Sequence, residues 1–309
     1  MKYSLITCTY NAERYVDYYF DIIENIDYDD FEVIIVDDCS KDSTFEKIQN
    51  RKNISKANII TYRQNTNRGP GIARNKGIEL SSGERIVFLD MDDKLESSIF
   101  RVLDEYDGDC IFFNYYKWYS DEKKVEHSSL YGGLQNGDDI DDVMRRTTGA
   151  VWGKVFSREI IVSNKVEFPE LYKTEDLVFT ISYLVNCKRV VTCNKALYYY
   201  RISDSSAMNT NIENQISNTD KAMTILKKVL VNHVATYEII YSKEVIYDFT
   251  NIYIRLGKSR NELEKFWRDK NIGICSGKNS SYYSLAQRIV FCLIRLKAYN
   301  SLILLNRLR

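Results

Sequence analysis

Strand-like and helix-like segments alternate strictly through the first ninety residues. Each short run rich in Val, Ile and Phe predicts a strand, and each longer segment with apolar residues at helical spacing predicts a helix. The expected strands are Tyr3 to Thr7, Phe31 to Val36, Ala57 to Tyr62 and Ile86 to Leu89, and the expected helices are Ala12 to Ile26 (capped by Asn11), Ser43 to Arg51 and Ile72 to Ser81. This alternation predicts an α/β fold with a doubly wound, mostly parallel sheet and helices on both faces.

Three carboxylates, Asp90, Asp92 and Asp93, follow the apolar run Ile86 to Leu89 directly. Like charges packed this closely repel one another, and a divalent cation would relieve that repulsion. Mg²⁺ and Mn²⁺ prefer oxygen ligands, commonly one or two carboxylates completed by substrate phosphates. The cluster therefore indicates a metal-assisted nucleotide-phosphate site, with an acidic solvated loop as the simpler alternative.

Polar clusters follow three of the predicted strands, at Cys8 to Asn11, Asp37-Asp38 and Asp90 to Asp93. Ligands of open α/β sheets bind beyond the carboxyl ends of the strands, where all three clusters would meet. We expect them to contact one ligand.

The pattern changes after the first ninety residues. We expect a strand at Cys110 to Asn114, a hairpin with an acidic turn at Asp121-Glu122, two short strands at Val190 to Cys193 and Ala196 to Arg201, and helices from about Asn211 onward. The sequence therefore predicts a catalytic domain over residues 1–208 and a helical region over 209–309.

Charge is unevenly distributed along a chain whose net charge is zero. From Lys270 to the end there are seven basic side chains and no acidic one, so the preceding residues carry a net charge of −7. Apolar runs at Ile289 to Ile294 and Leu302 to Leu305 lie within this basic stretch. The tail is expected to meet an anionic membrane surface, its own core or a second subunit, as in a homo-oligomer.

The location predicted from the sequence is cytoplasmic, with a peripheral contact at the inner face of the membrane. Seven scattered cysteines without a Cys-x-x-Cys pair indicate a reduced compartment. The apolar run at the start is too short for a signal peptide, and no run reaches the roughly 18 residues of a spanning helix. Basic aromatic patches for nucleic acid are absent from the main domain.

Five blocks of sequence together resemble the family-2 inverting glycosyltransferases of GT-A type fold, of the kind that builds bacterial surface polysaccharides. The blocks are Ser4 to Asn11, Val33 to Thr44, Asn67 to Gly77, Phe88 to Asp93 and Lys173 to Leu177. The resemblance covers roughly residues 1 to 205. It implies a nucleotide-sugar donor, with UDP the commonest, and a lipid-linked glycan acceptor such as a capsule or lipopolysaccharide unit.

The resemblance also implies roles for individual residues on the donor side. Asp92 and Asp90 would bind Mg²⁺ or Mn²⁺, with Asp90 also facing the ribose and Asp93 supporting the site. The expected donor-binding residues are Thr9, Tyr10, Asp38, Arg68, Asp90 and Arg201. Arg74 is an alternative cation to Arg68, although a structural role on its helix is equally open.

On the acceptor side, Asp176 is the expected general base, with Glu175 beside it, and Trp152 and Lys154 would line the sugar. A carboxylate at a helix N-terminus is stabilised in its ionised form, as a base requires. The simpler alternative is that Glu175 and Asp176 only complement the helix dipole.

Other enzyme classes fit the sequence less well. No Gly-x-Gly-x-x-Gly follows the first strand, and no Gly-Lys-Ser/Thr element is present, which argues against dinucleotide oxidoreductases and P-loop kinases. A sugar-phosphate nucleotidyltransferase would need a Gly-rich loop where Cys8 to Asn11 stands. A non-catalytic nucleotide-sugar-binding protein is the remaining alternative, and donor hydrolysis would distinguish it.

Overall fold

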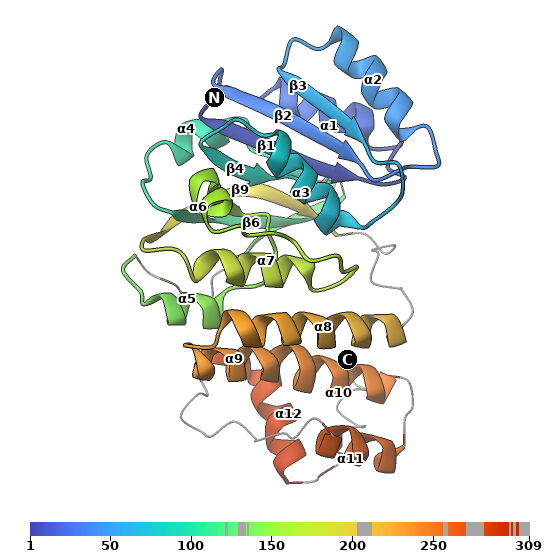
Figure 1. The fold of residues 1–309 in the computed structure, drawn as a ribbon, viewed down its shortest axis with the longest axis vertical. Helices are drawn as coiled ribbons and strands as arrows, with labels where there is room; N and C mark the ends of the chain where they lie inside the picture. Colours follow the sequence, from blue (N-terminus) through green and yellow to red (C-terminus); the bar gives the residue numbers. More distant parts are fainter. Residues whose placement is uncertain are drawn as a thin grey trace. The chain divides into compact units, whose positions relative to one another are not determined.

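The structure is a computed structural model that describes residues 1–120, 123–128, 134, 136–202, 212–255, 259–269, 281–296, 298 and 301–302. The chain divides into two compact units, Met1–Asn209 and Thr210–Arg309. In the first unit the described residues form one nine-stranded sheet with the order β3-β2-β1-β4-β8-β6-β9-β5, and β7 pairs with β6 (Figure 1).

The first half of this sheet is parallel. Its strands are β1 (Tyr3–Thr9), β2 (Phe31–Asp37), β3 (Ile59–Arg63) and β4 (Arg85–Phe88), and its crossover helices are α1 (Val16–Glu24), α2 (Thr44–Ile54) and α3 (Pro70–Leu80). The inner strands β1, β2 and β4 are short, largely apolar runs buried on both faces, as parallel sheets covered by helices require, whereas the edge strand β3 is exposed at its end. The expected α/β fold is therefore confirmed in this half.

Helices cover both faces of the parallel strands. On one face, Leu5 and Val33 share a core with Phe20 of α1 and Phe100 of α4 (Ile99–Leu103). On the other face, α3 approaches β1 closely, because a Cβ added at Gly77 would stand 2.4 Å from Ile6 Cγ2. This close approach sets how near the side chains of α3 come to the strand ends.

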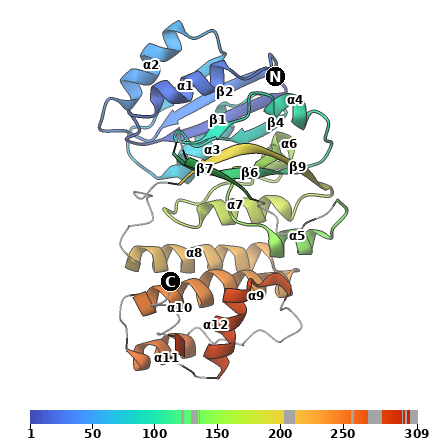
Figure 2. The same ribbon diagram turned by 180° about the vertical axis from the view of Figure 1, so that it is seen from behind.

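The second half of the sheet is mixed. β8 (Lys154–Ser157) runs antiparallel to both β4 and β6 (Cys110–Ser120), and β6 pairs in parallel with β9 (Val190–Arg201). Two short strands pair antiparallel with these: β5 (Lys94–Leu95) with β9, and β7 (Lys123–Ser128) with β6. Figure 2 shows β7 beside β6 and β9. The expected strands at 190–193 and 196–201 form one strand with register shifts opposite Asn114. The expected acidic turn at Asp121 and Glu122 lies outside the described residues.

Helix α7 (Glu175–Leu184) packs on this half through aromatic rings. Phe179 stacks on Phe168 with ring centroids 3.9 Å apart, and both rings meet Phe88 of β4 edge-on. The shorter helices α5 (Ile140–Arg146) and α6 (Arg158–Ser163) complete the unit. The aromatic cluster fixes the start of α7 near the end of β4.

The expected cap at Asn11 is wrong. Helix α1 begins at Val16, and Asn11 adopts a positive φ of 51°. Its Oδ1 instead accepts a hydrogen bond from the Lys41 backbone N–H at 2.8 Å. Asn and Asp tolerate the left-handed region better than other residues, which suits Asn11 to a tight turn after β1.

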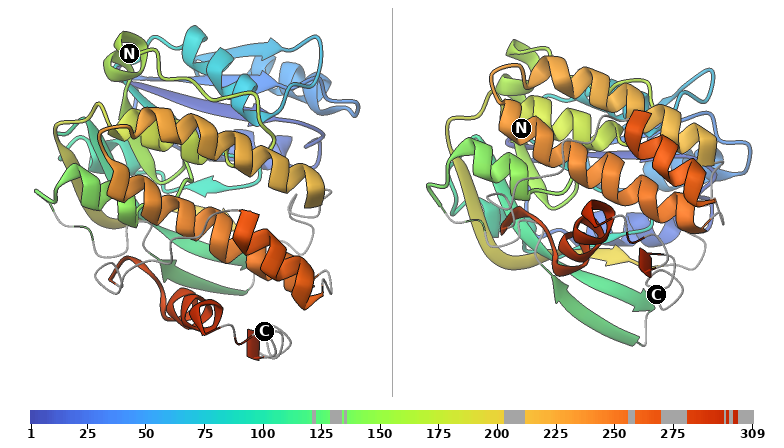
Figure 3. Two further views of the ribbon diagram at one scale, coloured as in Figure 1. Left: turned by 60° about the horizontal axis from the view of Figure 1, so that its bottom comes forward. Right: turned by 90° about the horizontal axis from the view of Figure 1, so that it is seen from below.

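The second unit is helical. Helix α8 (Ile212–Val229) runs beside α9 (Val234–Tyr241), which continues through a π-helical stretch (Ser242–Tyr247) into α10 (Asp248–Arg255), as Figure 3 shows. Trp267 of α11 (Arg260–Asp269) donates to Thr250 Oγ1 at 3.0 Å. Helix α12 (Leu285–Arg295) begins with a capping box of Ser284 and Gln287. Among the described residues, no helix has the length and apolar character to span a membrane.

Candidate active site

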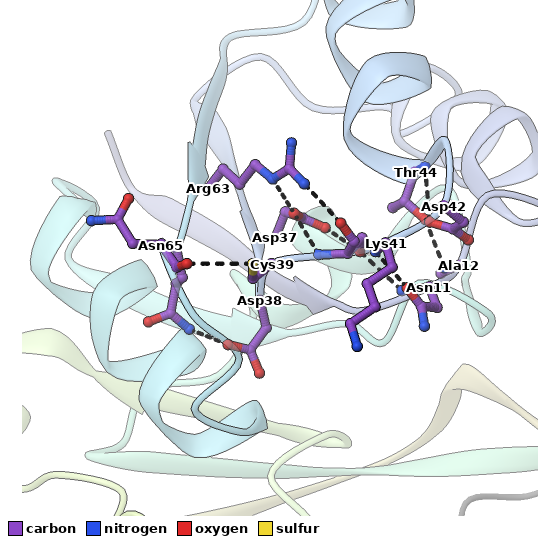
Figure 4. A network of polar contacts seen from close by, with 12 residues as sticks. Asn11, Ala12, Asp37, Asp38, Cys39, Lys41, Asp42, Thr44, Arg63 and Asn65 are labelled. Carbon is purple, nitrogen blue, oxygen red and sulfur yellow. Dashed lines mark hydrogen bonds and ion pairs between the residues drawn. The ribbon is translucent and has the colours of Figure 1, made fainter.

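The carboxyl ends of β1 and β2 carry a dense polar network (Figure 4). The Asp38 backbone N–H donates to Thr9 O at 2.8 Å and ties the two strand ends together. Asp37 is buried, accepts from the Ser40 backbone N–H at 3.0 Å and pairs with Arg63 at 3.3 Å. Asp37 is thus committed to holding the turn after β2.

The Asp38 carboxylate holds the loop that leads into α3. It accepts hydrogen bonds from Gln64 Nε2 at 2.6 Å, from the Arg68 backbone N–H at 2.9 Å and from the Gly69 backbone N–H at 2.8 Å. Burial raises the pKa of Asp38, and the two backbone hydrogen bonds counteract that shift. A nucleobase N–H would share these oxygens with the loop, so its recognition by Asp38 stays a prediction.

Next to Asp38, Thr9 offers a hydroxyl group and Tyr10 an aromatic ring. Thr9 Oγ1 is buried and has no hydrogen-bond partner among the described residues. A buried hydroxyl left unpaired costs about 1–3 kcal/mol, which a ligand atom would recover. The Tyr10 side chain is 42% exposed and leaves a ring face open to stacking. Both arrangements suit a nucleoside.

The Arg68 guanidinium does not point into this site. Its Nε and Nη2 bind the Glu170 carboxylate at 3.1 and 2.8 Å, and both side chains are about half exposed. Only the backbone of Arg68 reaches Asp38. The expected phosphate contact from Arg68 therefore requires this exposed ion pair to open.

Asp93 has a structural position within the acid cluster after β4. Its buried carboxylate accepts from Tyr198 Oη at 2.5 Å and from the Arg201 backbone N–H at 2.7 Å. Burial and the neighbouring carboxylates of Asp90 and Asp92 raise the pKa of Asp93 well above its ordinary value. Asp93 thereby joins β9 to the segment that follows β4, and its supporting role in a metal site stays a prediction.

Asp92 has no ion-pair partner among the residues that the structure describes. Burial and the charge of Asp90 raise the pKa of its carboxyl group. The described residues contain no group of three or more Asp, Glu, His or Cys side chains able to hold a metal alone. The Asp92 carboxylate, with Asp90 two residues before it, fits a hard cation whose remaining ligands come from substrate phosphates.

Arg74 joins the acid cluster to the start of α7. Its side chain is 7% exposed, Nη1 binds Asp176 Oδ1 at 2.6 Å, and Nη2 binds Asp90 Oδ1 at 3.2 Å. Glu175 Oε1 lies 3.6 Å from the same Nη1. One buried guanidinium thereby brings together carboxylates that are 86 residues apart in the chain (90 and 176). The sequence alone left open whether Arg74 is an alternative cation to Arg68 or a structural residue on its helix.

The backbone lets α3 and α7 approach closely enough for this bridge. A Cβ at Gly71 would lie 3.2 Å from Glu175 Cγ and 3.1 Å from Pro169 O. Burial raises the pKa of Glu175 to about 7, and repulsion from Asp176 adds to the shift. Burial also raises the pKa of Asp176, while Arg74 lowers it. With a side chain 25% exposed, Asp176 is open to an acceptor, whereas Glu175 is buried.

Arg201 closes the cluster from β9. Its guanidinium stacks on the Trp118 ring at 3.8 Å, and its Nε donates to the Asp92 carbonyl at 2.8 Å. This cation–π contact holds the arginine beside the acids without neutralising their carboxylates. Arg201 therefore lies where an anionic diphosphate would meet the Asp90–Asp93 segment.

The two expected acceptor residues differ in access. Trp152 is half-buried and stacks between Tyr198 and Tyr200, with centroid distances of 5.0 and 4.8 Å. Lys154 is wholly buried, so a direct contact with an acceptor is excluded in this structure. It stands on β8 under Phe112, where the sheet covers it.

Comparison with known proteins places this site in a family. The sequence model of glycosyl transferase family 2 matches residues 4–161. Poly(ribitol-phosphate) beta-N-acetylglucosaminyltransferase TarS of Staphylococcus aureus is 27% identical over 214 residues, which cover 65% of this chain and 35% of TarS. The chain thus spans about a third of the length of that relative.

Solved structures share the fold. S. aureus TarS 1-349 in complex with UDP-GlcNAc superposes with a TM-score of 0.62 at 22% identity, covering 96% of this chain and 92% of that one. The mannosyltransferase PcManGT of Pyrobaculum calidifontis, in complex with GDP-Man and Mn²⁺, has a TM-score of 0.55 at 14% identity and covers 96% and 87%. The fold is of GT-A type, and the chain belongs to glycosyl transferase family 2.

Proposed function

We propose that the protein is an inverting glycosyltransferase that moves a sugar from a UDP-sugar to a hydroxyl group of a bacterial surface glycan. The observation that carries this proposal is the Arg74 bridge, which holds Asp90 of the donor side and Asp176 of the acceptor side on one guanidinium. Donor activation and acceptor deprotonation then take place within one cluster.

Asp176 acts as the general base. The acceptor hydroxyl gives its proton to the Asp176 carboxylate while its oxygen forms a bond to the anomeric carbon. The bond from that carbon to the diphosphate oxygen breaks on the opposite face, which inverts the anomeric centre. Arg74 orients the carboxylate and lowers its pKa, which keeps it ionised as a base must be.

The donor is held along the strand ends. Thr9 and Tyr10 meet the nucleoside, Asp38 fixes the loop around it, and Arg201 approaches the diphosphate. Mg²⁺ or Mn²⁺ held by Asp92 and Asp90 would supply positive charge for the departing diphosphate. This assignment is supported by the Asp92 carboxylate, which forms no ion pair with any residue that the structure describes, and by the Mn²⁺ in the PcManGT complex.

The substrate class is inferred from relatives. The names of TarS and of its complex specify transfer of N-acetylglucosamine to poly(ribitol-phosphate) and binding of UDP-GlcNAc. For this chain we propose a UDP-hexose or UDP-N-acetylhexosamine donor and a capsule, lipopolysaccharide or related polymer as acceptor.

A panel of nucleotide sugars tests the function. A true donor should raise the melting temperature of the protein in the presence of Mn²⁺. The protein should hydrolyse that donor slowly when alone and transfer its sugar when an acceptor is added. Asp176→Asn should retain donor affinity and lose transfer by about two to four orders of magnitude. The exposed variant Asp27→Asn makes the same chemical change away from the site and should behave as wild type. Donor binding without hydrolysis or transfer would instead indicate a non-catalytic nucleotide-sugar-binding protein.

We also propose that α12 docks the enzyme at the cytoplasmic face of the membrane, where a lipid-linked acceptor lies. Leu285, Ile289, Cys292 and Leu296 form an exposed apolar stripe at helical spacing. Anionic lipid contributes about 1 kcal/mol for each basic residue near the surface. The expected apolar run Leu302 to Leu305 lies largely outside the described residues, as do the basic residues Lys270, Lys278, Lys297, Arg307 and Arg309.

Vesicle co-sedimentation tests this docking. The doubly substituted Leu285→Ser/Leu296→Ser chain should bind anionic vesicles at low salt more weakly than wild type. A matched Val231→Ser/Val234→Ser chain, which changes two exposed valines outside α12, should bind normally. Docking through α12 would be contradicted if all three chains sediment equally with the vesicles, or if no chain sediments with them.

A further inference from the structure

The ring of Tyr15 brings two arginines together. Tyr15 is half-buried in the turn between β1 and α1. The guanidinium carbon of Arg14 lies 4.5 Å from the centroid of this ring, and that of Arg201, at the end of β9, lies 5.6 Å from it. Both distances fall within the range of about 6 Å over which an aromatic ring attracts a cation. Two positive charges from distant parts of the chain therefore meet at one aromatic side chain.

Neither of these arginines forms an ion pair with a residue that the structure describes. The side chain of Arg14 is exposed and makes no hydrogen bond there. Arg201 donates through Nε to a backbone carbonyl, that of Asp92. By contrast, three arginines between the end of β3 and α3 all bind carboxylates, namely Arg63, Arg68 and Arg74. An anionic ligand would offset the repulsion between the two guanidinium groups at Tyr15.

The two arginines lie beside the acids that follow β4. β1 and β4 are adjacent parallel strands, so the turn after β1 and the acids after β4 belong to the same edge of the sheet. The hydrogen bond from Arg201 Nε to the Asp92 carbonyl, 2.8 Å long, fixes one guanidinium there. Burial and Asp90 raise the pKa of the Asp92 carboxyl, whereas the charges of Arg201 and Arg14 lower it. A ligand that reaches Asp92 would therefore meet both arginines.

We propose that Arg14 is a donor-binding residue, which together with Arg201 binds the diphosphate of the nucleotide sugar. This inference rests on the proposed function, in which Arg201 approaches that diphosphate. A guanidinium group presents a planar fork of N–H donors that matches the oxygens of a phosphate. Because the acceptor reacts through a neutral hydroxyl group, the donor diphosphate is the anion that matches the charge of this pair.

The two arginines contribute in different ways. Arg201 is held by the Asp92 carbonyl and by the Trp118 ring, which fixes its position before the donor arrives. Arg14 is held only by Tyr15, and a cation–π contact at an exposed site is weaker than charge-assisted hydrogen bonds to phosphate. The donor can therefore draw the Arg14 guanidinium from the ring onto its phosphate oxygens.

A comparison of UDP with uridine, measured by calorimetry in EDTA, tests this assignment. Arg14→Met removes the charge from an exposed side chain, so the variant should fold. We expect its affinity for UDP to fall about tenfold, because a charge-assisted hydrogen bond is lost at a solvated site. Its affinity for uridine should not change, since uridine carries no phosphate. Arg14→Lys keeps the charge without the planar fork and should recover part of the loss.

Arg101→Met is the matched control, because it makes the same change at an exposed arginine that pairs with Asp27. Both affinities should stay at their wild-type values in this chain. An unchanged UDP affinity in Arg14→Met, or an equal loss of UDP and uridine affinity, would overturn the proposal.

Inorganic pyrophosphate at low ionic strength distinguishes this inference from the proposed function. Wild type should bind pyrophosphate in EDTA, and Arg14→Met should bind it more weakly. If no nucleoside diphosphate binds to wild type but pyrophosphate shows this difference, the proposed donor is refuted and the diphosphate site at Arg14 stands. If wild type binds neither UDP nor pyrophosphate, or if both chains bind pyrophosphate equally, Arg14 is not a diphosphate-binding residue.

Discussion

Replacement of Arg74 by Met should destabilise the protein more than any exposed arginine substitution does. Arg74 is buried and is the ion-pair partner of Asp90, Glu175 and Asp176. Removal of one partner from a buried ion pair costs about 3–5 kcal/mol, because a charge is left without compensation. Asp90 and Asp176 keep 33% and 25% of their side chains exposed, and water therefore recovers part of this loss. We expect the free energy of unfolding to fall by about 2–4 kcal/mol at pH 8.

The stability that Arg74→Met removes should depend on pH, and the two carboxyl groups on α7 determine whether it grows or shrinks as the pH rises. Arg74 lowers the pKa of Glu175 and Asp176, so both pKa values rise further above their unfolded values in the variant. A group with a raised folded-state pKa stabilises the protein below its unfolded pKa, and this stabilisation is lost as pH rises through the folded pKa. The pKa of Glu175 is already about 7 in wild type. The free energy of unfolding of the variant should therefore approach that of wild type by about 1 kcal/mol when the pH is lowered from 8 to 6.

Urea unfolding at pH 6 and pH 8, followed by circular dichroism, measures this effect. Arg101→Met is the matched control, because Arg101 pairs with Asp27 at 2.8 Å with both side chains largely exposed. Such pairs contribute less than about 1 kcal/mol, with little pH dependence in this range. If Arg74→Met costs no more than Arg101→Met at either pH, the acid cluster does not depend on Arg74 and the bridge has no energetic importance.

Two further variants test other parts of the site. In calorimetry, Asp92→Asn should abolish the difference in UDP affinity between Mn²⁺ and EDTA while the circular dichroism spectrum stays unchanged; an Asp92→Asn chain with full metal-dependent affinity would remove Asp92 from the metal site. Gly77→Ala should lower the free energy of unfolding by about 1–3 kcal/mol in urea, because its Cβ would lie 2.4 Å from Ile6 Cγ2. In an Ile6→Ala background Gly77→Ala should cost less than in wild type, and an equal cost in both backgrounds would show that the overlap with Ile6 is not the cause.

The order of strands and helices in the parallel half could be predicted because burial imposes periodicity on the sequence. β2 and β4 are nearly continuous apolar runs, and the acids that follow β4 stand directly at its end. Residues close in sequence stay close at a strand end, so Asp90, Asp92 and Asp93 required no tertiary information.

The partners of these acids could not be predicted in the same way. Arg74 and Asp176 are far apart in the chain, and nothing in a helical pattern reveals which neighbour a charged side chain will meet. Lys154 was expected beside an acceptor because the family resemblance implied that position, yet β8 places it wholly inside, where lysine is rare. The expected cap at Asn11 failed for a similar reason, since its side chain accepts a hydrogen bond from the Lys41 backbone N–H of another loop.

The position of Asp176 depends on both halves of the sheet. Arg74 reaches it from α3, the crossover helix that precedes β4, and α3 comes close because glycines stand at 71 and 77. Helix α7, which carries Asp176, packs through Phe179 on Phe88 of β4 and on Phe156 of β8, which runs antiparallel to β4. Without the Arg74 ion pairs, Asp176 would lose its link to Asp90 at the end of β4. The mixed order of strands thus explains how α7 brings one carboxylate to the acids at the strand ends.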